Sequence, residues 1–192
     1  MAGLILASTS AYRRQLLTRL GLPFETLAPG VNEAHIEGES AADRALRLSL
    51  EKANAVARAH PAAVVIGADQ VAVCGDRILD KPGDAARCRE QLRALSGRMA
   101  SFYTACAVLG GPRRAHLAHV DTTSVLFREL DSTEIERYVA HERPFDCAGG
   151  FRAEALGISL FESIESRDPT ALIGLPLIWV AAALRAAGFL LP

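Results

Sequence analysis

Strand-like and helix-like segments alternate along this 192-residue chain. Residues 3–7 and 62–74 are apolar runs typical of buried strands, and residues 40–60 repeat apolar side chains at helical spacing. This alternation favours an α/β fold built on a mixed sheet. The other predicted elements are strands over 24–28, 101–109, 118–130 and the latter part of 147–166, helices over 10–21, 84–96 and around 135–139, and a C-terminal helix from about Pro176.

Local signals mark where several of these segments begin or turn. Ser10 or Thr9 is placed to cap the first helix, because a side-chain oxygen there accepts a hydrogen bond from a first-turn amide. Asp131 and Glu134 have the spacing of a capping box. The Gly-Asp pair at 75–76 indicates a tight turn between two strands.

Composition narrows the class of protein. The formal net charge is −1, whereas a nucleic-acid partner normally calls for a basic surplus. The apolar run near the C-terminus is interrupted by Gly174 and Pro176 and closed by Arg185, which leaves fewer than about 18 clean apolar residues for a membrane span. The apolar run at 4–7 is too short for a signal peptide. We therefore expect a cytoplasmic protein without a membrane or nucleic-acid partner.

The cysteines and histidines do not suggest a soft-metal site. The four cysteines are well separated, and the histidines form no H-E-x-x-H motif. We expect buried, reduced thiols and no structural zinc. The residues concerned are Cys74, Cys88, Cys106, Cys147, His35, His60, His116, His119 and His141.

The segment from Ser8 to Arg14 has the features of an anion site. A buried strand leads into small hydroxyl residues and then into a helix start that carries Arg13 and Arg14. Helix N-termini attract anions, and two arginines in a first turn oppose the helix dipole unless an anion lies nearby. Phosphate binding and a simple capped helix with solvated arginines both remain open on this pattern.

Asp69 follows the apolar run VVIGA, so its carboxylate is expected at the end of a buried strand, with Gln70 beside it. An ionised carboxylate in such a place is costly unless a cation or hydrogen-bond donors compensate it. A turn-capping role is possible, but we favour a metal ligand or general base.

Four further charged residues are ambiguous on their own. Glu33 lies in an irregular acidic loop, and Lys52 is expected to form an exposed ion pair with its neighbour on a long helix. Lys81 precedes a proline that keeps the local backbone extended, and such a lysine can act as a point charge on phosphate. Glu154 follows the glycine pair at 149–150, which suggests a bend or a close backbone approach.

Taken together, these motifs resemble the Maf family of nucleotide pyrophosphatases over essentially the whole chain. The matching pieces are LILASTSAYRRQLL, VNE at 31–33, EKA at 51–53, GADQ at 67–70, LDKP at 79–82, LSG at 95–97, and the later CAGGFRAEALGISLFESIESRDPTALIGLPL. The resemblance implies a single domain over 1–192 with an elongated mixed sheet flanked by helices, similar to the ITPase fold. It also implies two lobes with a cleft between them and no separate linker.

Within that family the chain is similar to the YceF-type subgroup. The signs are Tyr12 before the arginine pair, Gln70 after the catalytic aspartate, and the segment that contains Glu154. The subgroup is associated with hydrolysis of 7-methyl-GTP to 7-methyl-GMP and pyrophosphate. Subgroups that act on dTTP and UTP typically have threonine after the aspartate.

The chain departs from the family pattern at three positions. Ala11 replaces a common proline, which only preorganises a first helical turn. Asn32 replaces a common aspartate and could weaken metal binding, and Gly150 stands where serine is common.

The resemblance implies roles for individual residues. A Mg²⁺ or Mn²⁺ ion would be held by Glu33, Asp69 and triphosphate oxygens, because hard ions prefer oxygen ligands. Asp69 would activate water for attack on the α-phosphorus. Phosphate charge would be neutralised by Arg13, Lys52 and Lys81, with Ser8 positioning the phosphates.

The base would be recognised separately from the triphosphate. N7-methylation gives guanine a positive charge, which the aromatic face of Tyr12 could stabilise. Glu154 could accept from the guanine N1 and N2 groups, and Gln70 could contact another base edge.

Two other functions stay open. The same chemistry could act on GTP, UTP or dTTP, or the protein could be a non-catalytic nucleotide-binding regulator of cell division. The resemblance also suggests a homodimer.

Overall fold

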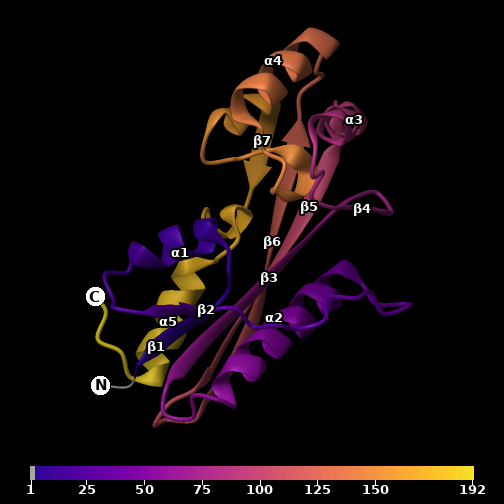
Figure 1. Ribbon diagram of the computed structural model, residues 1–192. Helices are drawn as coiled ribbons and strands as arrows, with labels where there is room; N and C mark the ends of the chain where they lie inside the picture. Colours follow the sequence, from indigo (N-terminus) through magenta and orange to yellow (C-terminus); the bar gives the residue numbers. More distant parts are fainter. Residues whose placement is uncertain (1–2) are drawn as a thin grey trace. The chain divides into compact units, whose positions relative to one another are not determined.

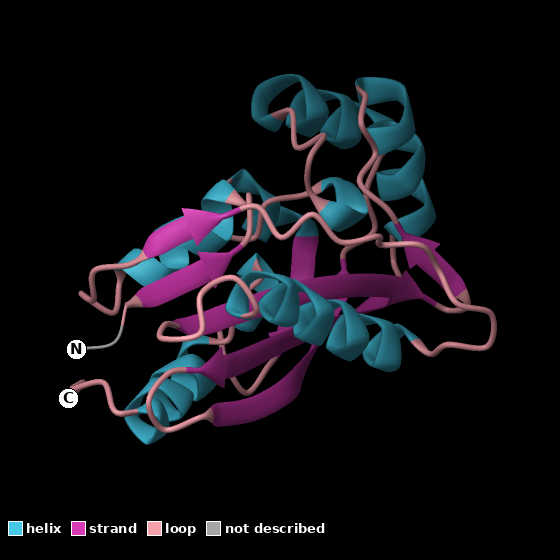
Figure 2. Ribbon diagram, turned by 60° about the horizontal axis from the view of Figure 1, so that its bottom comes forward, coloured by secondary structure: helices cyan, strands magenta, loops and turns pink. Residues whose placement is uncertain are grey.

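The computed structural model describes residues 3–192. In chain order the elements are β1 (Leu4–Ala7), α1 (Ala11–Thr18), β2 (Glu25–Leu27), α2 (Ala41–Ala57), β3 (Val64–Cys74), β4 (Arg77–Leu79), α3 (Ala85–Leu95), β5 (Met99–Gly110), β6 (Ala115–Phe127), α4 (Ser132–Glu142), η1 (Ala148–Gly150), η2 (Leu156–Leu160), β7 (Phe161–Glu165), η3 (Ala171–Ile173) and α5 (Leu177–Ala187). The predicted order of strands and helices is confirmed (Figures 1 and 2).

Within the described residues, seven strands form one mixed sheet. Its order is β2-β1-β3-β5-β6-β7, and β4 pairs with β3. β1 runs parallel to both β2 and β3, whereas β4 and β7 pair antiparallel with β3 and β6. The prediction of a mixed sheet flanked by helices is therefore confirmed.

The chain divides into two compact units. Unit 1 contains residues 3–70, 103–121 and 168–192, and unit 2 contains residues 71–102 and 122–167. Strands β3, β5 and β6 each contribute residues to both units.

In unit 1 both faces of the sheet are covered by helices. Leu6 of β1 and Ile66 of β3 pack with residues of α1 and α5. Ile5 and Val65, one position away on the same strands, pack with Ala53 and other residues of α2. Successive side chains of a strand point to opposite faces, so this alternation assigns each β3 residue to one side of the sheet.

Unit 2 has its own apolar centre. Phe151 makes edge-to-face contacts with Phe102, Phe127 and Phe161, at ring-centroid distances of 5.4, 5.5 and 4.9 Å. Helix α3 packs against α4 and the turn η1. Aromatic rings in this arrangement contribute both buried area and favourable quadrupole contacts.

Most of the local signals correspond to observed hydrogen bonds. Ser10 is the N-cap of α1, and its side chain accepts from the Arg13 amide. Asp131 and Glu134 form the expected capping box at α4. The turn at 75–76 joins β3 to β4 as an antiparallel hairpin.

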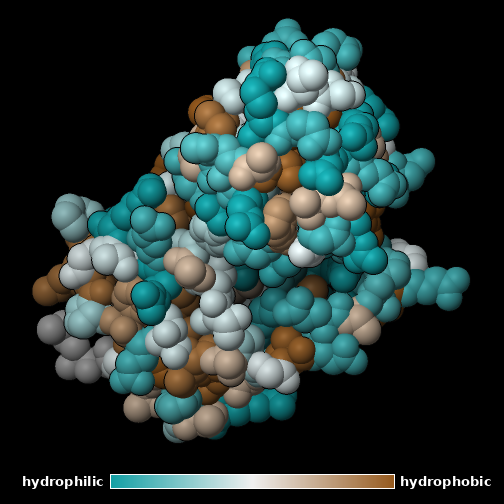
Figure 3. Space-filling model, turned by 45° about the horizontal axis from the view of Figure 1, so that its top comes forward, coloured by the Kyte–Doolittle hydropathy of each residue, from teal (hydrophilic) through white to brown (hydrophobic). Residues whose placement is uncertain are grey.

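Three further features are the burial of the cysteines, the polarity of the surface and the hydropathy of the helices. Cys74, Cys88 and Cys106 are buried, but Cys147 is only half-buried, in contrast to the expectation that all four would be buried. Hydrophilic residues cover much of the face in Figure 3, with apolar residues scattered among them. Among the helices of residues 3–192, none has the length and apolar character that a membrane crossing requires.

Candidate functional site

The carboxyl end of β1 places Ser8 beside β3. Ala7 pairs with Gly67, and β3 continues past this point whereas β1 stops. The Ser8 side-chain oxygen accepts from the Ser10 amide at 3.1 Å, so the hydroxyl proton can be donated to a ligand. The carboxyl ends of parallel strands are where ligands bind in open α/β sheets.

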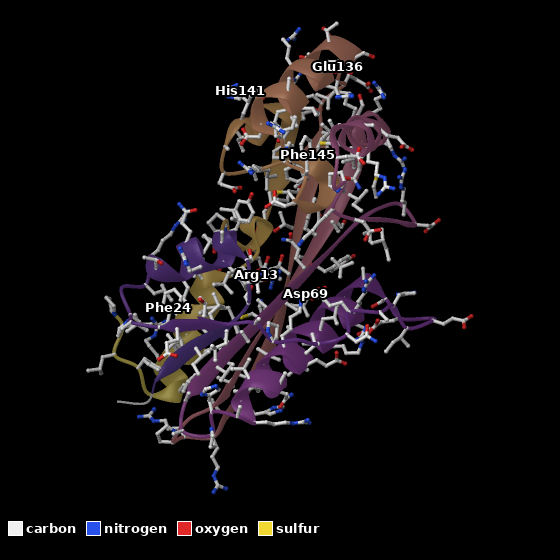
Figure 4. All side chains as sticks on the ribbon, viewed as in Figure 1. Arg13, Phe24, Asp69, Glu136, His141 and Phe145 are labelled. Carbon is white, nitrogen blue, oxygen red and sulfur yellow. The ribbon has the colours of Figure 1, made fainter. Side chains whose placement is uncertain are left out.

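The two arginines of α1 have different environments. Arg13 is half-buried, and its Nε donates to the carbonyl oxygen of Gly174 at 3.0 Å. Figure 4 shows Arg13 between α1 and the segment that precedes α5. Arg14 is exposed, and Tyr12 in the same turn is half-buried. The fixed Nε leaves the terminal guanidinium nitrogens of Arg13 as the donors for an anion.

Helix α2 lies unusually close to β3 at Gly67. A Cβ atom at this position would collide with the Ser49 carbonyl oxygen and would lie 2.6 Å from the Ala53 amide nitrogen. The absence of a side chain therefore lets the α2 backbone contact the strand directly. This contact brings Lys52 of α2 next to Asp69, two residues after Gly67.

Lys52 lies between two carboxylates. Its Nζ is 2.6 Å from Asp69 Oδ1 and 2.6 Å from Glu33 Oε1. Lys52 and Asp69 are buried, whereas the Glu33 side chain is 58% exposed. The expectation of an exposed ion pair with its neighbour was wrong: Glu51 pairs with Arg47 instead. Burial is possible because the ammonium is compensated on two sides.

The loop that carries Glu33 is fastened to α2. Arg44 donates to the Glu33 carbonyl oxygen at 3.2 Å, and Arg47 donates to the Ala34 carbonyl oxygen at 3.2 Å. Arg47 also binds the Glu39 carboxylate through two nitrogens, at 2.6 and 2.8 Å. The hydrogen bond from Arg47 lowers the pKa of Glu39 below its ordinary value. These bonds hold the Glu33 carboxylate in place although its side chain reaches solvent.

The oxygen atoms of Glu33 and Asp69 are of the kind that hard cations prefer as ligands. No group of three or more metal-ligating side chains occurs in the part of the chain that the structure describes. Glu33 and Asp69 nevertheless converge on one nitrogen, so their oxygens lie close together. Mg²⁺ is commonly bound by one or two carboxylates, with phosphates and water completing its shell. The two carboxylates could therefore contribute two oxygen ligands to such an ion.

Gln70 faces the side of the sheet opposite to Asp69. Its Nε2 donates to the Thr104 hydroxyl at 2.8 Å and lies 3.1 Å from the carbonyl oxygens of Ala171 and Leu172. Thr104 belongs to none of the motifs from which the site was predicted. The available signal was a polar residue within the predicted strand over 101–109, where burial demands hydrogen-bond partners.

Lys81 and Glu154 belong to unit 2. Lys81 is exposed on the loop between β4 and α3, whose Asp80 carbonyl oxygen accepts from Gln91 at 3.0 Å. Glu154 is exposed on the segment between η1 and η2. The expected bend before it is confirmed by φ angles of 80° at Gly149 and 71° at Gly150.

The structure thus groups the predicted residues by unit. Ser8, Tyr12, Arg13, Glu33, Lys52, Asp69 and Gln70 belong to unit 1, and Lys81 and Glu154 belong to unit 2. Direct contacts join Glu33, Lys52 and Asp69. Together these three residues combine a buried ammonium with two carboxylates, and a carboxylate held in this way is suited to accept a proton.

Comparison with known proteins gives full-length relatives. A protein of Xanthomonas oryzae pv. oryzae named 7-methyl-GTP pyrophosphatase is 54% identical over 192 residues, covering 100% of both chains. Proteins of the same name from Aromatoleum aromaticum and Pseudomonas aeruginosa are 51% and 53% identical, covering 98% and 93% of this chain and 97% and 93% of theirs.

A solved structure and a family model complete the comparison. The Ham1 protein of Staphylococcus aureus aligns with a TM-score of 0.46 and 15% identity, over 66% of this chain and 72% of that one, a likeness too weak to carry an argument. The family model described as Maf-like protein matches residues 3–187, nearly the whole chain. The chain belongs to the Maf-like protein family.

Proposed function

We propose that this protein is a nucleotide pyrophosphatase that hydrolyses 7-methyl-GTP to 7-methyl-GMP and pyrophosphate. The observation that carries the proposal is the ammonium of Lys52 held at 2.6 Å by both Glu33 and Asp69. Support for the substrate comes from the full-length relatives that bear the name 7-methyl-GTP pyrophosphatase.

In the proposed reaction, Asp69 receives a proton from the attacking water. Lys52 donates to Oδ1, which assigns the proton to the other oxygen, Oδ2. The water oxygen forms a bond to the α-phosphorus, the bond from that phosphorus to the bridging oxygen breaks, and pyrophosphate leaves with the bridging oxygen. A carboxylate oriented in this way is a suitable general base.

Two cationic groups and one hydroxyl are assigned to the triphosphate. Arg13 presents its terminal nitrogens, Ser8 its hydroxyl proton and Lys81 its ammonium, so that phosphate charge is neutralised as pyrophosphate leaves. Glu33 and Asp69 would hold Mg²⁺ or Mn²⁺. When bound, such an ion withdraws charge from phosphate oxygens.

The base is assigned to three other residues. Tyr12, half-buried in the first turn of α1, would stack on the positively charged 7-methylguanine. Glu154 would accept from N1 and N2 of the base. Gln70 would contact the base through Oε1, because its Nε2 already donates within unit 1.

Turnover of 7-methyl-GTP, GTP, UTP and dTTP with Mg²⁺ and with Mn²⁺ tests the substrate. We expect the highest kcat/KM for 7-methyl-GTP and release of pyrophosphate rather than phosphate. In ¹⁸O-labelled water, attack at the α-phosphorus puts the label in the nucleoside monophosphate. Label in pyrophosphate would refute the mechanism, and equal turnover of all four nucleotides would refute the substrate assignment.

An Asp69→Asn variant tests the base. Its kcat should fall by a factor of roughly 10² to 10⁴, the usual contribution of a positioned general base. Asp76→Asn, at an exposed turn, is the matched control and should keep full activity. Unchanged hydrolysis by Asp69→Asn would contradict the mechanism. Absence of hydrolysis by the unaltered protein would favour the alternative function, a non-catalytic nucleotide-binding regulator.

The cytoplasmic location and the homodimer stay predictions. Size-exclusion chromatography with light scattering would determine the oligomeric state. The absence of a nucleic-acid partner also stays a prediction, which a binding assay with mixed-sequence RNA and DNA would check.

A further inference from the structure

The segment at residues 168–175, here called the pre-α5 loop, is fastened to the first turn of α5. The buried carboxylate of Asp168 accepts from the Ile178 amide at 2.7 Å. The Thr170 hydroxyl oxygen accepts from the Leu177 amide at 2.9 Å. These bonds satisfy amides that a helix start leaves without partners, so one end of the loop is rigidly held.

Thr104 holds the middle of the pre-α5 loop. It is fully buried on β5, and its hydroxyl donates to the Ala171 carbonyl oxygen at 2.9 Å. The Thr104 hydroxyl oxygen itself accepts from Gln70 Nε2 at 2.8 Å. The hydroxyl thus uses its single proton and a lone pair at once, which fixes its orientation. Removing a buried hydroxyl that both donates and accepts leaves its buried partners without hydrogen bonds, which costs free energy.

A continuous path of hydrogen bonds leads from Thr104 to Arg13. The Ala171 carbonyl oxygen that accepts from Thr104 also accepts from the Gly174 amide at 2.8 Å. The carbonyl oxygen of Gly174 in turn accepts from Arg13 Nε at 3.0 Å. A single residue, Gly174, carries both of these bonds and so links the Ala171 carbonyl oxygen to the acceptor of Arg13.

We propose that Thr104 is a positioning residue for the reaction, acting through the Gly174 carbonyl oxygen to aim Arg13 at the triphosphate. The inference rests on the proposed function, because it requires Arg13 to contact phosphate. A guanidinium bound at Nε has its plane and direction set, which matters for two-point recognition of phosphate oxygens. A small misplacement of such a group can reduce turnover strongly.

Thr104→Val removes the hydroxyl while keeping the side-chain shape. We expect kcat/KM to fall about tenfold, mainly through KM, because a lost hydrogen bond of typical strength changes an equilibrium by about that factor. Thr104→Ser, which restores the hydroxyl, should recover kcat/KM to within about threefold of the unaltered protein. Thr123→Val is the control: Thr123 is equally buried, and its hydroxyl bonds to Ser166 in unit 2.

A double-mutant cycle separates positioning from general support of the fold. In the Arg13→Ala background, Thr104→Val should change kcat/KM less than about twofold, because the group through which it acts is gone. An undiminished tenfold loss in that background, or failure of Thr104→Ser to recover activity, would overturn the inference. An equal loss in Thr123→Val would do the same.

The cycle also distinguishes this inference from the proposed function. If Arg13→Ala leaves kcat/KM unchanged, Arg13 does not bind phosphate. This result would refute both its role in the proposed function and the positioning role of Thr104. If Arg13→Ala is damaging but Thr104→Val is harmless, only the positioning role fails.

Should Thr104→Val not fold, Gly174→Ala tests the same path from its other end. Gly174 has φ of 121°, which strains any other residue and would displace its carbonyl oxygen. Gly188→Ala is matched to it, since Gly188 has φ of 103° and ends α5. We expect a loss of kcat/KM of about tenfold beyond that of the control. Equal values for the two variants would overturn the inference.

Discussion

Asp69 and Gln70 are neighbours on β3, and their side chains face opposite sides of the sheet. The Asp69 carboxylate accepts from Lys52 of α2, whereas the Gln70 amide donates to the Ala171 carbonyl oxygen before α5. The residues assigned to water activation and the path that orients Arg13 therefore lie on different faces. Both residues follow Gly67, which pairs with Ala7 at the point where β1 ends and Ser8 follows.

Replacement of Lys52 by methionine should destabilise unit 1 as well as reduce activity. The change leaves the buried Asp69 carboxylate without its partner, which we expect to lower the free energy of unfolding by about 3 kcal/mol. Chemical denaturation measures this loss, and adding Asp69→Asn should recover part of it. Lys81→Met is the control. Because Lys81 is exposed, its replacement should change the free energy of unfolding by less than about 0.5 kcal/mol. Equal stability of both single variants would contradict the buried-pair interpretation.

Glu33→Gln should affect metal binding more than folding. Lys52 keeps its bond to Asp69 and Glu33 is 58% exposed, so stability should change by less than about 1 kcal/mol. Loss of a carboxylate ligand should raise the Mn²⁺ concentration for half-saturation about tenfold in the presence of nucleotide, measured by water proton relaxation. Glu37→Gln, an exposed position in the same loop, should leave it unchanged. If both variants bind Mn²⁺ alike, Glu33 is not a ligand.

Gly67→Ala should separate α2 from β3. The added Cβ would meet the backbone of α2 at Ser49 and Ala53, where no flexible side chain can yield. We expect a loss of stability of about 2–3 kcal/mol, as for other overpacked cores, and a fall in kcat as Lys52 moves away from Asp69. Gly3→Ala is the control, since a Cβ atom added at Gly3 would meet nothing within 4 Å. A stable, fully active Gly67→Ala protein would show that the close approach is unnecessary.

The buried thiols should make stability fall at alkaline pH. Burial raises the pKa of Cys88 to about 11 and of Cys106 to about 12. Their ordinary pKa is about 8.5, so above this value the unfolded chain loses thiol protons that the folded protein retains. The free energy of unfolding should then decrease by up to about 1.4 kcal/mol per pH unit for each thiol. The free energy of unfolding should keep decreasing with pH until the pH reaches the pKa values of the two thiols in the folded protein.

Urea denaturation between pH 8 and pH 10.5 measures this decrease. A Cys88→Ala, Cys106→Ala double variant is the comparison, and its stability should depend less steeply on pH. Parallel pH profiles for the two proteins would exclude the thiols as the cause.

The sequence alone determined the features that depend on neighbouring residues. The apolar run of β3, the Ser10 cap of α1 and the capping box at Asp131 are set within a few residues, because periodicity and end-capping are local effects. Local patterns also indicated an anion site at Ser8 to Arg14 and favoured a metal ligand or general base at Asp69. The family resemblance proposed specific roles for Asp69 and Arg13, and those roles stay predictions.

Only the tertiary structure decided the environment of Lys52 and the role of Thr104. Lys52 was expected to be exposed, but the approach of α2 to Gly67 buries it between two carboxylates. Ala171 is separated in the chain by 67 positions from Thr104 and by 101 positions from Gln70, the two residues that donate to its carbonyl oxygen. Such contacts depend on which strands become neighbours in the sheet, and hydrophobic periodicity carries no information about that pairing.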